Sequence, residues 1–190
     1  MQSKGVNVVL TREPGGSVVA EKVRDILLDP KSKVFPICEL MLYESARAQH
    51  LQEVIKPNLE KGYVVICDRF TDSTLAYQGY GRKIDIRIIE KLNDIATLGI
   101  KPDLTIYLDI NPNIGIQKAK AVSKERFLNG DRIERENITF HNSVRRGFLA
   151  LAKKYPKRIK KVKTSSVIAK TQALINKEID KFFIKNKKYV

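Results

Sequence analysis

Short apolar runs alternate with helix-like periodicity along this chain, and this alternation predicts an α/β fold. The runs are bounded by glycine, proline and other turn residues, as is typical of strands. We expect four strands, at Val6–Leu10, Tyr63–Cys67, Leu104–Leu108 and Ile159–Val162. The run from Val64 to Ile66 is continuous rather than alternating, which predicts a strand buried on both faces of a parallel sheet.

Between these runs, apolar residues recur three and four positions apart, which indicates helices. Ser17 is a candidate N-cap, and Pro57 is expected to break a long helical stretch. The predicted helices cover residues 17–28, 37–59, 84–98, 112–122, 131–154 and 167–183. Strands that alternate with helices predict a parallel sheet with helices on both of its faces.

Composition indicates one soluble globular domain over residues 1–190, with 43% apolar and 30% charged residues. Because no run of about 18 apolar residues is present, we expect no transmembrane span. The N-terminus lacks the apolar core of a secretory signal, and two cysteines suit a reducing compartment. We therefore predict a cytoplasmic protein.

The formal net charge of +15 fits nucleic acid, a membrane surface or anionic small molecules as partners. Lysines are densest after Lys153 and in the segment Lys181–Lys188, where the aromatic residues lack the regular spacing of a single-strand binder. We interpret that segment as a solvated face and assign the remaining charge to phosphate groups.

An Asp-Arg pair follows the second predicted strand, at the edge where open α/β sheets bind ligands. The Asp68 carboxylate can hold Mg²⁺ directly or through water, and the Arg69 guanidinium can bind a phosphate with two hydrogen bonds. Polar side chains for a small ligand follow at Ser73, Thr74, Tyr77 and Gln78. A structural ion pair is the alternative interpretation of Asp68 and Arg69.

The loop after the first predicted strand reads Thr-Arg-Glu-Pro-Gly-Gly at positions 11–16. Its two glycines allow the backbone to approach a ligand closely, and Arg12 and Glu13 lie at the same edge of the predicted sheet. A plain loop is the alternative.

Glu39, Tyr43 and Arg47 are spaced four residues apart and share one face of a predicted helix. A tyrosine ring can stack on a nucleobase, and an arginine one turn away can donate to a base carbonyl. The alternative is an aromatic core contact beside an exposed ion pair on the helix.

Residues 117–132 carry many cations over a segment with no apolar period. Such a segment can be a flap that closes over a polyphosphate and supplies charge in the transition state, or a solvated loop. The cations are Lys118, Lys120, Lys124, Arg126 and Arg132.

Several of these motifs together resemble the bacterial thymidylate kinase family. The segment from Ile66 to Phe70, with Ser73-Thr74 and Ala76-Tyr77-Gln78, is similar to that family's signature. The loop at 11–16, the helix face at 39–50, Gly81-Arg82, residues 102–109 and Asp131–Glu134 follow in the family's order. The similarity runs from about Lys4 to Ile159.

The resemblance implies a P-loop NTPase-like nucleoside-monophosphate kinase that transfers a phosphoryl group from ATP to dTMP, giving dTDP for dTTP biosynthesis. It implies Mg²⁺ as cofactor, a homodimer, and a lid at 117–132. For the nucleoside, it implies that Tyr43 stacks on thymine and that Arg47 binds its O4 atom. It further implies that Tyr77 crowds the 2′ position of the sugar, and that the base and sugar are lined by Ser73, Thr74 and Gln78.

For the phosphates, the resemblance implies that Arg69 holds the acceptor phosphate, helped by Arg12 or Glu13, and that Asp68 assists the metal. Arg69, Arg12 and Arg126 are then the catalytic cations. The ATP phosphates are expected to meet Lys124, Arg126 and Arg132.

The family also has a first strand followed by Gly-x-x-x-x-Gly-Lys-[Ser/Thr], whose amides cradle the ATP phosphates. No glycine in these 190 residues is followed by Lys-Ser or Lys-Thr. We therefore expect that the first strand and the P-loop are missing, that the sheet has a hole, and that this polypeptide has little kinase activity. The alternative function is a non-catalytic, basic remnant that binds nucleotides or nucleic acid.

Overall fold

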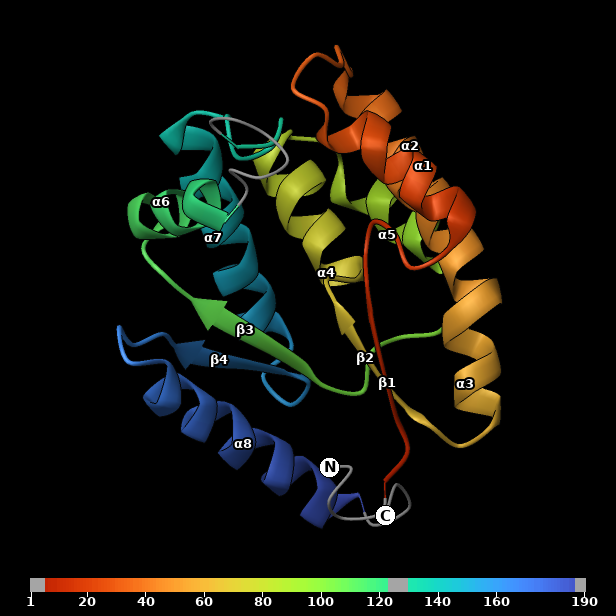
Figure 1. Ribbon diagram of the computed structural model, residues 1–190, viewed down its shortest axis with the longest axis vertical. Coiled ribbons are helices and arrows are strands. Elements are labelled where there is room, and N and C mark those ends of the chain that lie inside the picture. Colours follow the sequence, from red (N-terminus) through yellow and green to blue (C-terminus); the bar gives the residue numbers. More distant parts are fainter. Residues whose placement is uncertain (1–5, 123–129, 187–190) are drawn as a thin grey trace.

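The computed structural model describes residues 6–122 and 130–186, and it contains helices arranged around two small parallel sheets (Figure 1). Strand β1 (Val8–Arg12) pairs in parallel with β2 (Val64–Asp68). Strand β3 (Thr105–Asp109) pairs in parallel with β4 (Ile159–Lys163). The four strands predicted from the apolar runs are confirmed, with small shifts of their bounds.

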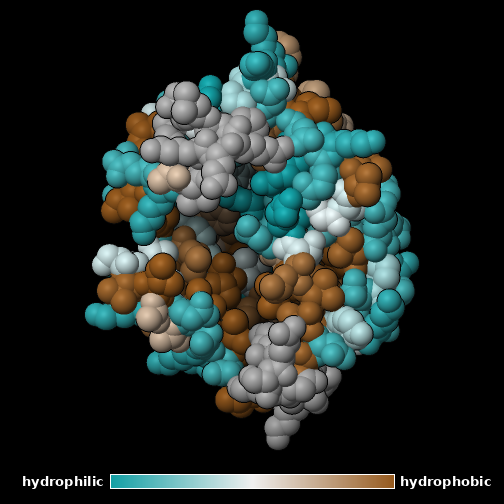
Figure 2. Space-filling model, in the orientation of Figure 1, coloured by the Kyte–Doolittle hydropathy of each residue, from teal (hydrophilic) through white to brown (hydrophobic). Residues whose placement is uncertain are grey.

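The strands form two separate two-stranded sheets, whereas the alternation of strands and helices predicts one parallel sheet and the resemblance predicts a hole in it. Figure 1 shows β2 and β3 on the two sides of a gap, with β1 and β4 on the outer sides. Within the described ranges, the edges of β2 and β3 that face this gap pair with no other strand. Figure 2 shows a hollow on this face between the two sheets, with apolar residues along it.

The apolar side chains of these strands are more exposed than the sequence predicts. Ile66 is 40% exposed, and Leu10, its neighbour in the register of β1 and β2, is 75% exposed. Leu108 of β3 is 43% exposed. Parallel strands are normally covered on both faces. The prediction of a fully buried strand at Val64–Ile66 is therefore wrong for the described part of the chain.

Two long helical segments precede β2. Helix α1 (Val18–Leu28) begins as predicted at Ser17, whose hydroxyl accepts a hydrogen bond from the backbone N–H of Ala20. Helix α2 (Pro36–His50) continues through a π-helical turn, η2 (Leu51–Ile55), into α3 (Lys56–Glu60). Pro57 does not break this stretch, because it lies in the first turn of α3, where a missing N–H is tolerated.

Helices also occupy the segment after β2, for which the sequence predicts no strand or helix. They are α4 (Thr71–Thr74) and the π-helical η3 (Leu75–Gly81). They bring the polar residues of this segment onto regular, mostly buried turns. The chain then forms α5 (Ile86–Ala96) and, after β3, α6 (Pro112–Val122).

Helix α7 (Ile138–Lys154) begins later than the predicted start at Asp131. Asp131 and Glu134 form a capping box, in which the Asp131 carboxylate accepts from the N–H of Glu134 and the Glu134 carboxylate accepts from the N–H of Asp131. The turn that this box starts ends before α7 begins. Asn137 is the N-cap, and its side chain accepts from the N–H of Phe140. The final helix, α8 (Ile168–Lys185), packs against β4.

The core consists of two apolar clusters on either side of η3. One contains Leu28, Ala76, Ile133, Phe140 and Val144. The other contains Leu40, Leu75, Ile89, Leu151 and Ile159. Among the described residues, none of the helices combines the length and apolar character needed to cross a lipid bilayer.

Candidate active site

Three predicted site residues from different elements converge beside the end of β2. Arg69 has a φ of 66°, and its guanidinium lies 5.1 Å from the centroid of the Tyr77 ring in η3. Tyr43 of α2 lies close to both. Burial raises the pKa of the Tyr43 hydroxyl, the negative charge of Glu39 raises it further, and the positive charge of Arg69 opposes this shift. The cluster therefore offers two aromatic rings beside one cation.

Arg47 lies within a buried polar network on the same face of α2. Its side chain is 2% exposed, and its Nε donates to Glu13 Oε2 at 2.8 Å. Its Nη1 donates to Glu44 Oε1 at 2.8 Å and to Asn93 Oδ1 at 2.7 Å. The alternative of an exposed helix ion pair is therefore wrong. Burial raises the pKa of the Glu44 carboxyl, and the nearby Arg47 charge opposes that shift.

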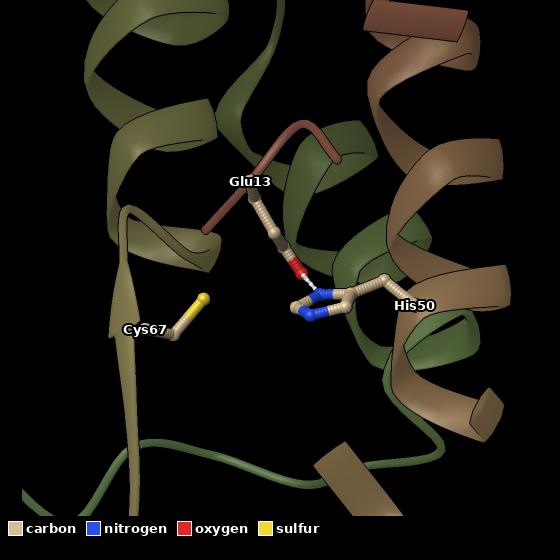
Figure 3. Close-up of side chains that lie close together, drawn as sticks. All are labelled: Glu13, His50 and Cys67. Carbon is tan, nitrogen blue, oxygen red and sulfur yellow. Dashed lines mark hydrogen bonds and ion pairs between the residues drawn. The ribbon is translucent and has the colours of Figure 1, made fainter. Parts of the chain in front are cut away.

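Glu13 joins this network to His50 and the first strand. In Figure 3 the Glu13 carboxylate points at the His50 ring, and the two are joined by a hydrogen bond of 3.1 Å between Oε1 and Nδ1. The other ring nitrogen, Nε2, lies 2.7 Å from Thr11 Oγ1. Both ring nitrogens of His50 therefore serve hydrogen bonds to neighbouring side chains.

Cys67 completes a group whose ligand atoms lie within 4.8 Å of one another, with Glu13 and His50 (Figure 3). Sulfur and imidazole ligands suit zinc, whereas Mg²⁺ takes oxygen ligands. Hydrogen bonds already engage Glu13 and both ring nitrogens of His50, and the Cys67 thiol donates to the backbone oxygen of Arg69 at 3.0 Å. We interpret this group as a structural network.

Glu39 is another buried carboxylate, with 0% exposure. It accepts hydrogen bonds from Gln78 Nε2 at 2.8 Å and from Arg82 Nε at 3.0 Å, and it pairs with Arg132 Nη1 at 2.7 Å. Burial favours the neutral carboxyl, but the hydrogen bonds from Arg82 and Gln78 and the positive charges of Arg82 and Arg132 together lower the pKa of Glu39. Arg132 also donates to the backbone oxygen of Leu27. It is thus anchored to α1 and α2.

The outer side of the site carries exposed charges. Arg12 is 52% exposed and pairs with Glu21 at 2.9 Å, while the same Glu21 oxygen accepts from the backbone N–H of Gly16. Asp68 is exposed at the carboxyl end of β2. Its oxygen ligands and its access to solvent fit Mg²⁺, which usually keeps several waters and takes one or two carboxylates.

The remaining predicted site residues fall into two groups. In α4, Ser73 is partly buried and Thr74 is buried, so both lie on the inner side of the segment after β2. The predicted lid residues Lys124 and Arg126 lie outside the described residues, and the rest of the predicted lid includes the end of α6.

Sequence reasoning missed Glu44 and Asn93, the partners of Arg47, and the inward role of Glu39. A signal for Glu39 exists, since it shares a helix face with Tyr43 and Arg47. It also missed Asp72, whose buried carboxylate pairs with Arg158 at 2.6 Å and so joins α4 to the residue preceding β4. No local pattern marks Asn93 or Arg158 as a partner.

Comparison with known proteins gives consistent matches over most of the chain. The sequence profile of the family "Thymidylate kinase" matches residues 1–175. The chain is 45% identical to a thymidylate kinase of Gloeobacter violaceus over 179 residues, which are 94% of this chain and 83% of that protein. It is 51% identical to a thymidylate kinase of Lactobacillus acidophilus over 151 residues, 79% of this chain and 68% of that protein.

A solved structure gives the same result for the fold. The crystal structure of thymidylate kinase from Ehrlichia chaffeensis aligns with a TM-score of 0.71 at 34% identity, covering 92% of this chain and 80% of that one. The arrangement of parallel strands, helices and cationic site is that of a P-loop NTPase-like kinase. Within this class, the chain belongs to the thymidylate kinase family. Members of this enzyme class are ATP:dTMP phosphotransferases.

Proposed function

We propose that this protein binds dTMP and phosphorylates it to dTDP, with ATP as donor and Mg²⁺ as cofactor. The observation that carries the proposal is the cluster of Tyr43, Arg69 and Tyr77, in which the Arg69 guanidinium lies 5.1 Å from the Tyr77 ring. Two aromatic rings and a cation suit a flat base linked to a phosphate.

In this proposal, residues from α2 and from α4 and η3 hold the nucleoside. Tyr43 stacks on thymine, and Arg47 donates to the O4 atom from within its buried network. Tyr77 crowds the 2′ position of the sugar and favours deoxyribose. Ser73, Thr74 and Gln78 line the base and sugar, consistent with the inner positions of Thr74 and Gln78.

The phosphates are assigned to the edge formed by the ends of β1 and β2. Arg69 binds the acceptor phosphate with its two parallel N–H groups, and Arg12 or Glu13 assists nearby. Asp68 holds Mg²⁺ directly or through water, and the ion supplies charge neutralisation between the phosphates. The predictions that Lys124, Arg126 and Arg132 meet the ATP phosphates, and that Arg126 is catalytic, remain part of this proposal.

We further propose that the gap between β2 and β3 accepts one more parallel strand, the one that carries the P-loop in P-loop kinases. The support is that the facing edges of β2 and β3 pair with no strand in the described part of the chain, and that Leu10, Ile66 and Leu108 are exposed. A strand with apolar residues on both faces would pair with both edges and would place its following loop beside Asp68 and Arg69. Without such a cradle, phosphoryl transfer loses most of its positioning, so residues 1–190 alone turn over slowly.

A coupled assay of ADP release tests both parts of the proposal. The 190-residue polypeptide is compared with a version that carries an N-terminal strand followed by Gly-x-x-x-x-Gly-Lys-Thr. Activity with dTMP and ATP that rises at least tenfold in the extended version supports the proposal. Equal activity in both versions contradicts the strand assignment, and no dTMP-dependent activity in either contradicts the kinase assignment.

We also propose a cytoplasmic homodimer and a single domain over residues 1–190, with a lid at 117–132. The second candidate function, a basic nucleotide- or nucleic-acid-binding remnant, is favoured only by the net charge of +15. Binding to DNA that weakens steeply with salt, without any response to dTMP, would support this second candidate.

A further inference from the structure

Glu39 shares the helix face of Tyr43 and Arg47, but the proposed function gives it no role. Its carboxylate is 0% exposed and lies one helical turn before Tyr43. Its Oε1 atom accepts from Gln78 Nε2 at 2.8 Å and from Arg82 Nε at 3.0 Å. It therefore touches a residue that the proposed function places beside the nucleotide.

Two arginines bind the other oxygen of this carboxylate. Arg82 Nη2 lies 2.9 Å from Glu39 Oε2, and Arg132 Nη1 lies 2.7 Å from the same atom. Two guanidinium groups favour the ionised carboxylate, which can accept hydrogen bonds but cannot donate them.

This charge fixes the orientation of the Gln78 amide. Because Glu39 only accepts, the amide must turn its NH₂ group toward it and its carbonyl oxygen, Oε1, away from it. Gln78 is 1% exposed, so the amide cannot turn over to satisfy its groups with bulk water. The atom left for a ligand is then an acceptor.

We propose that Glu39 is a positioning residue that sets base specificity, by holding Gln78 with its carbonyl oxygen toward the pyrimidine. The inference rests on the proposed nucleotide pocket and deepens it. Thymine and uracil carry a ring N3–H group that can donate to this oxygen. Cytosine has an acceptor at N3, so two acceptors would face each other unpaired, a mismatch that buried sites reject strongly.

Calorimetric titration with dTMP and with dCMP tests this role in three chains at a temperature where each is folded by circular dichroism. The chains are the wild type, Glu39→Gln and the matched control Glu136→Gln. Glu136 pairs with Arg82 Nη1 at 2.6 Å on the far side of the guanidinium, and its side chain is 26% exposed. The control therefore removes a carboxylate from the same arginine but leaves Glu39 against Gln78.

We expect the wild type and Glu136→Gln to bind dTMP at least tenfold more tightly than dCMP. Glu39→Gln is expected to bind with a smaller ratio, because an amide at position 39 can donate as well as accept and lets Gln78 turn over, while Arg47 keeps its own share of the preference through O4. A general loss of fold would weaken the binding of both nucleotides alike, whereas a lost orientation of the Gln78 amide changes the ratio of the two affinities. A folded Glu39→Gln chain with the wild-type ratio overturns the proposal.

Gln78→Met provides the second variant, should Glu39→Gln fail to fold. It keeps the side-chain length, leaves both arginines on Glu39, and removes the amide. A preference for dTMP in Gln78→Met that is as large as in the wild type overturns the proposal. A smaller preference supports it, since the Arg47 donor on O4 still disfavours cytosine, which has an amino group at that position. A wild type that binds dTMP and dCMP equally overturns this inference but not the pocket, whereas a wild type that binds no dTMP overturns both.

Discussion

Arg47 and Glu13 form a buried ion pair that joins helix α2 to the loop after β1. Arg47 Nε lies 2.8 Å from Glu13 Oε2, and the two side chains are 2% and 4% exposed. The pair holds the Thr-Arg-Glu-Pro-Gly-Gly loop against the helix that carries Tyr43. The proposed nucleoside and phosphate sites are therefore mechanically connected.

Removal of the Arg47 side chain is expected to lower the stability of the fold. In Arg47→Met, the carboxylates of Glu13 and Glu44 stay buried without their cation, so the free energy of unfolding should fall by about 3–5 kcal/mol. Urea denaturation measures this loss. The control is Arg87→Met, which removes the partner of Asp85 from an exposed pair, with Arg87 86% exposed, and should leave the urea midpoint unchanged. Equal midpoints for the two variants would argue against a buried network.

Two glycines with positive φ differ in the space around them. Gly16 has a φ of +83°, and a Cβ there would lie 2.6 Å from the His50 ring and 2.7 Å from Thr11 Oγ1. Gly62 has a φ of +76°, and no atom of the described residues lies within 4 Å of the same position. Gly62→Ala should cost only backbone strain, about 1–2 kcal/mol. Gly16→Ala should cost roughly 1–3 kcal/mol more, since it also overpacks the loop. Thermal unfolding of both variants measures this difference, and equal losses of stability would contradict the close packing at Gly16.

The Arg69 guanidinium is predicted to bind the nucleotide's phosphate rather than its base. Arg69→Met should therefore weaken dTMP binding on the order of 10- to 100-fold, the usual effect of losing hydrogen bonds to a charged group. Binding of thymidine, which has no phosphate, should change little. Calorimetry with both ligands makes the comparison. An equal loss of affinity for thymidine and dTMP would contradict the assignment of Arg69 to the phosphate.

Acid should remove the stabilisation that Glu39 provides. Its folded pKa lies below the ordinary value of 4.5, because the hydrogen bonds from Arg82 and Gln78 and the charges of Arg82 and Arg132 together outweigh the effect of burial. A depressed folded pKa stabilises the protein fully above the unfolded pKa and loses this effect as pH falls through the folded pKa. The difference in unfolding free energy between wild type and Glu39→Gln should therefore shrink below pH 4.5. A difference that grows on acidification would contradict this sign.

Much of the fold can be predicted from local patterns. The apolar runs place all four strands, and Ser17 places the start of α1, because both depend on neighbouring residues alone. The start of α7 is mispredicted because the turn capped by Asp131 and Glu134 does not continue into the helix, which begins after a second N-cap, Asn137. The division into two sheets depends on which strands meet in space, which a local pattern does not contain; the expectation of a hole in the sheet comes from the resemblance to a family.

The candidate site also has a part that the sequence predicts and a part that it does not. Tyr43, Arg69 and Tyr77 come together because strand ends and helix faces converge at one edge of an α/β fold. The environment of Arg47 could not be predicted, since its partner Asn93 comes from α5 and meets it only after α2 and α5 pack. The partners of Glu39 likewise come from segments 39 to 93 residues further along the chain.

The pocket for dTMP is the central claim, and calorimetry with dTMP on the wild type and Tyr43→Leu tests it most directly. We predict saturable binding of one dTMP per chain in the wild type. Tyr43→Leu should weaken it roughly 5- to 150-fold, the loss expected for one base–aromatic stack. A folded wild type that releases no heat with dTMP, or a Tyr43→Leu chain with wild-type affinity, would contradict the account.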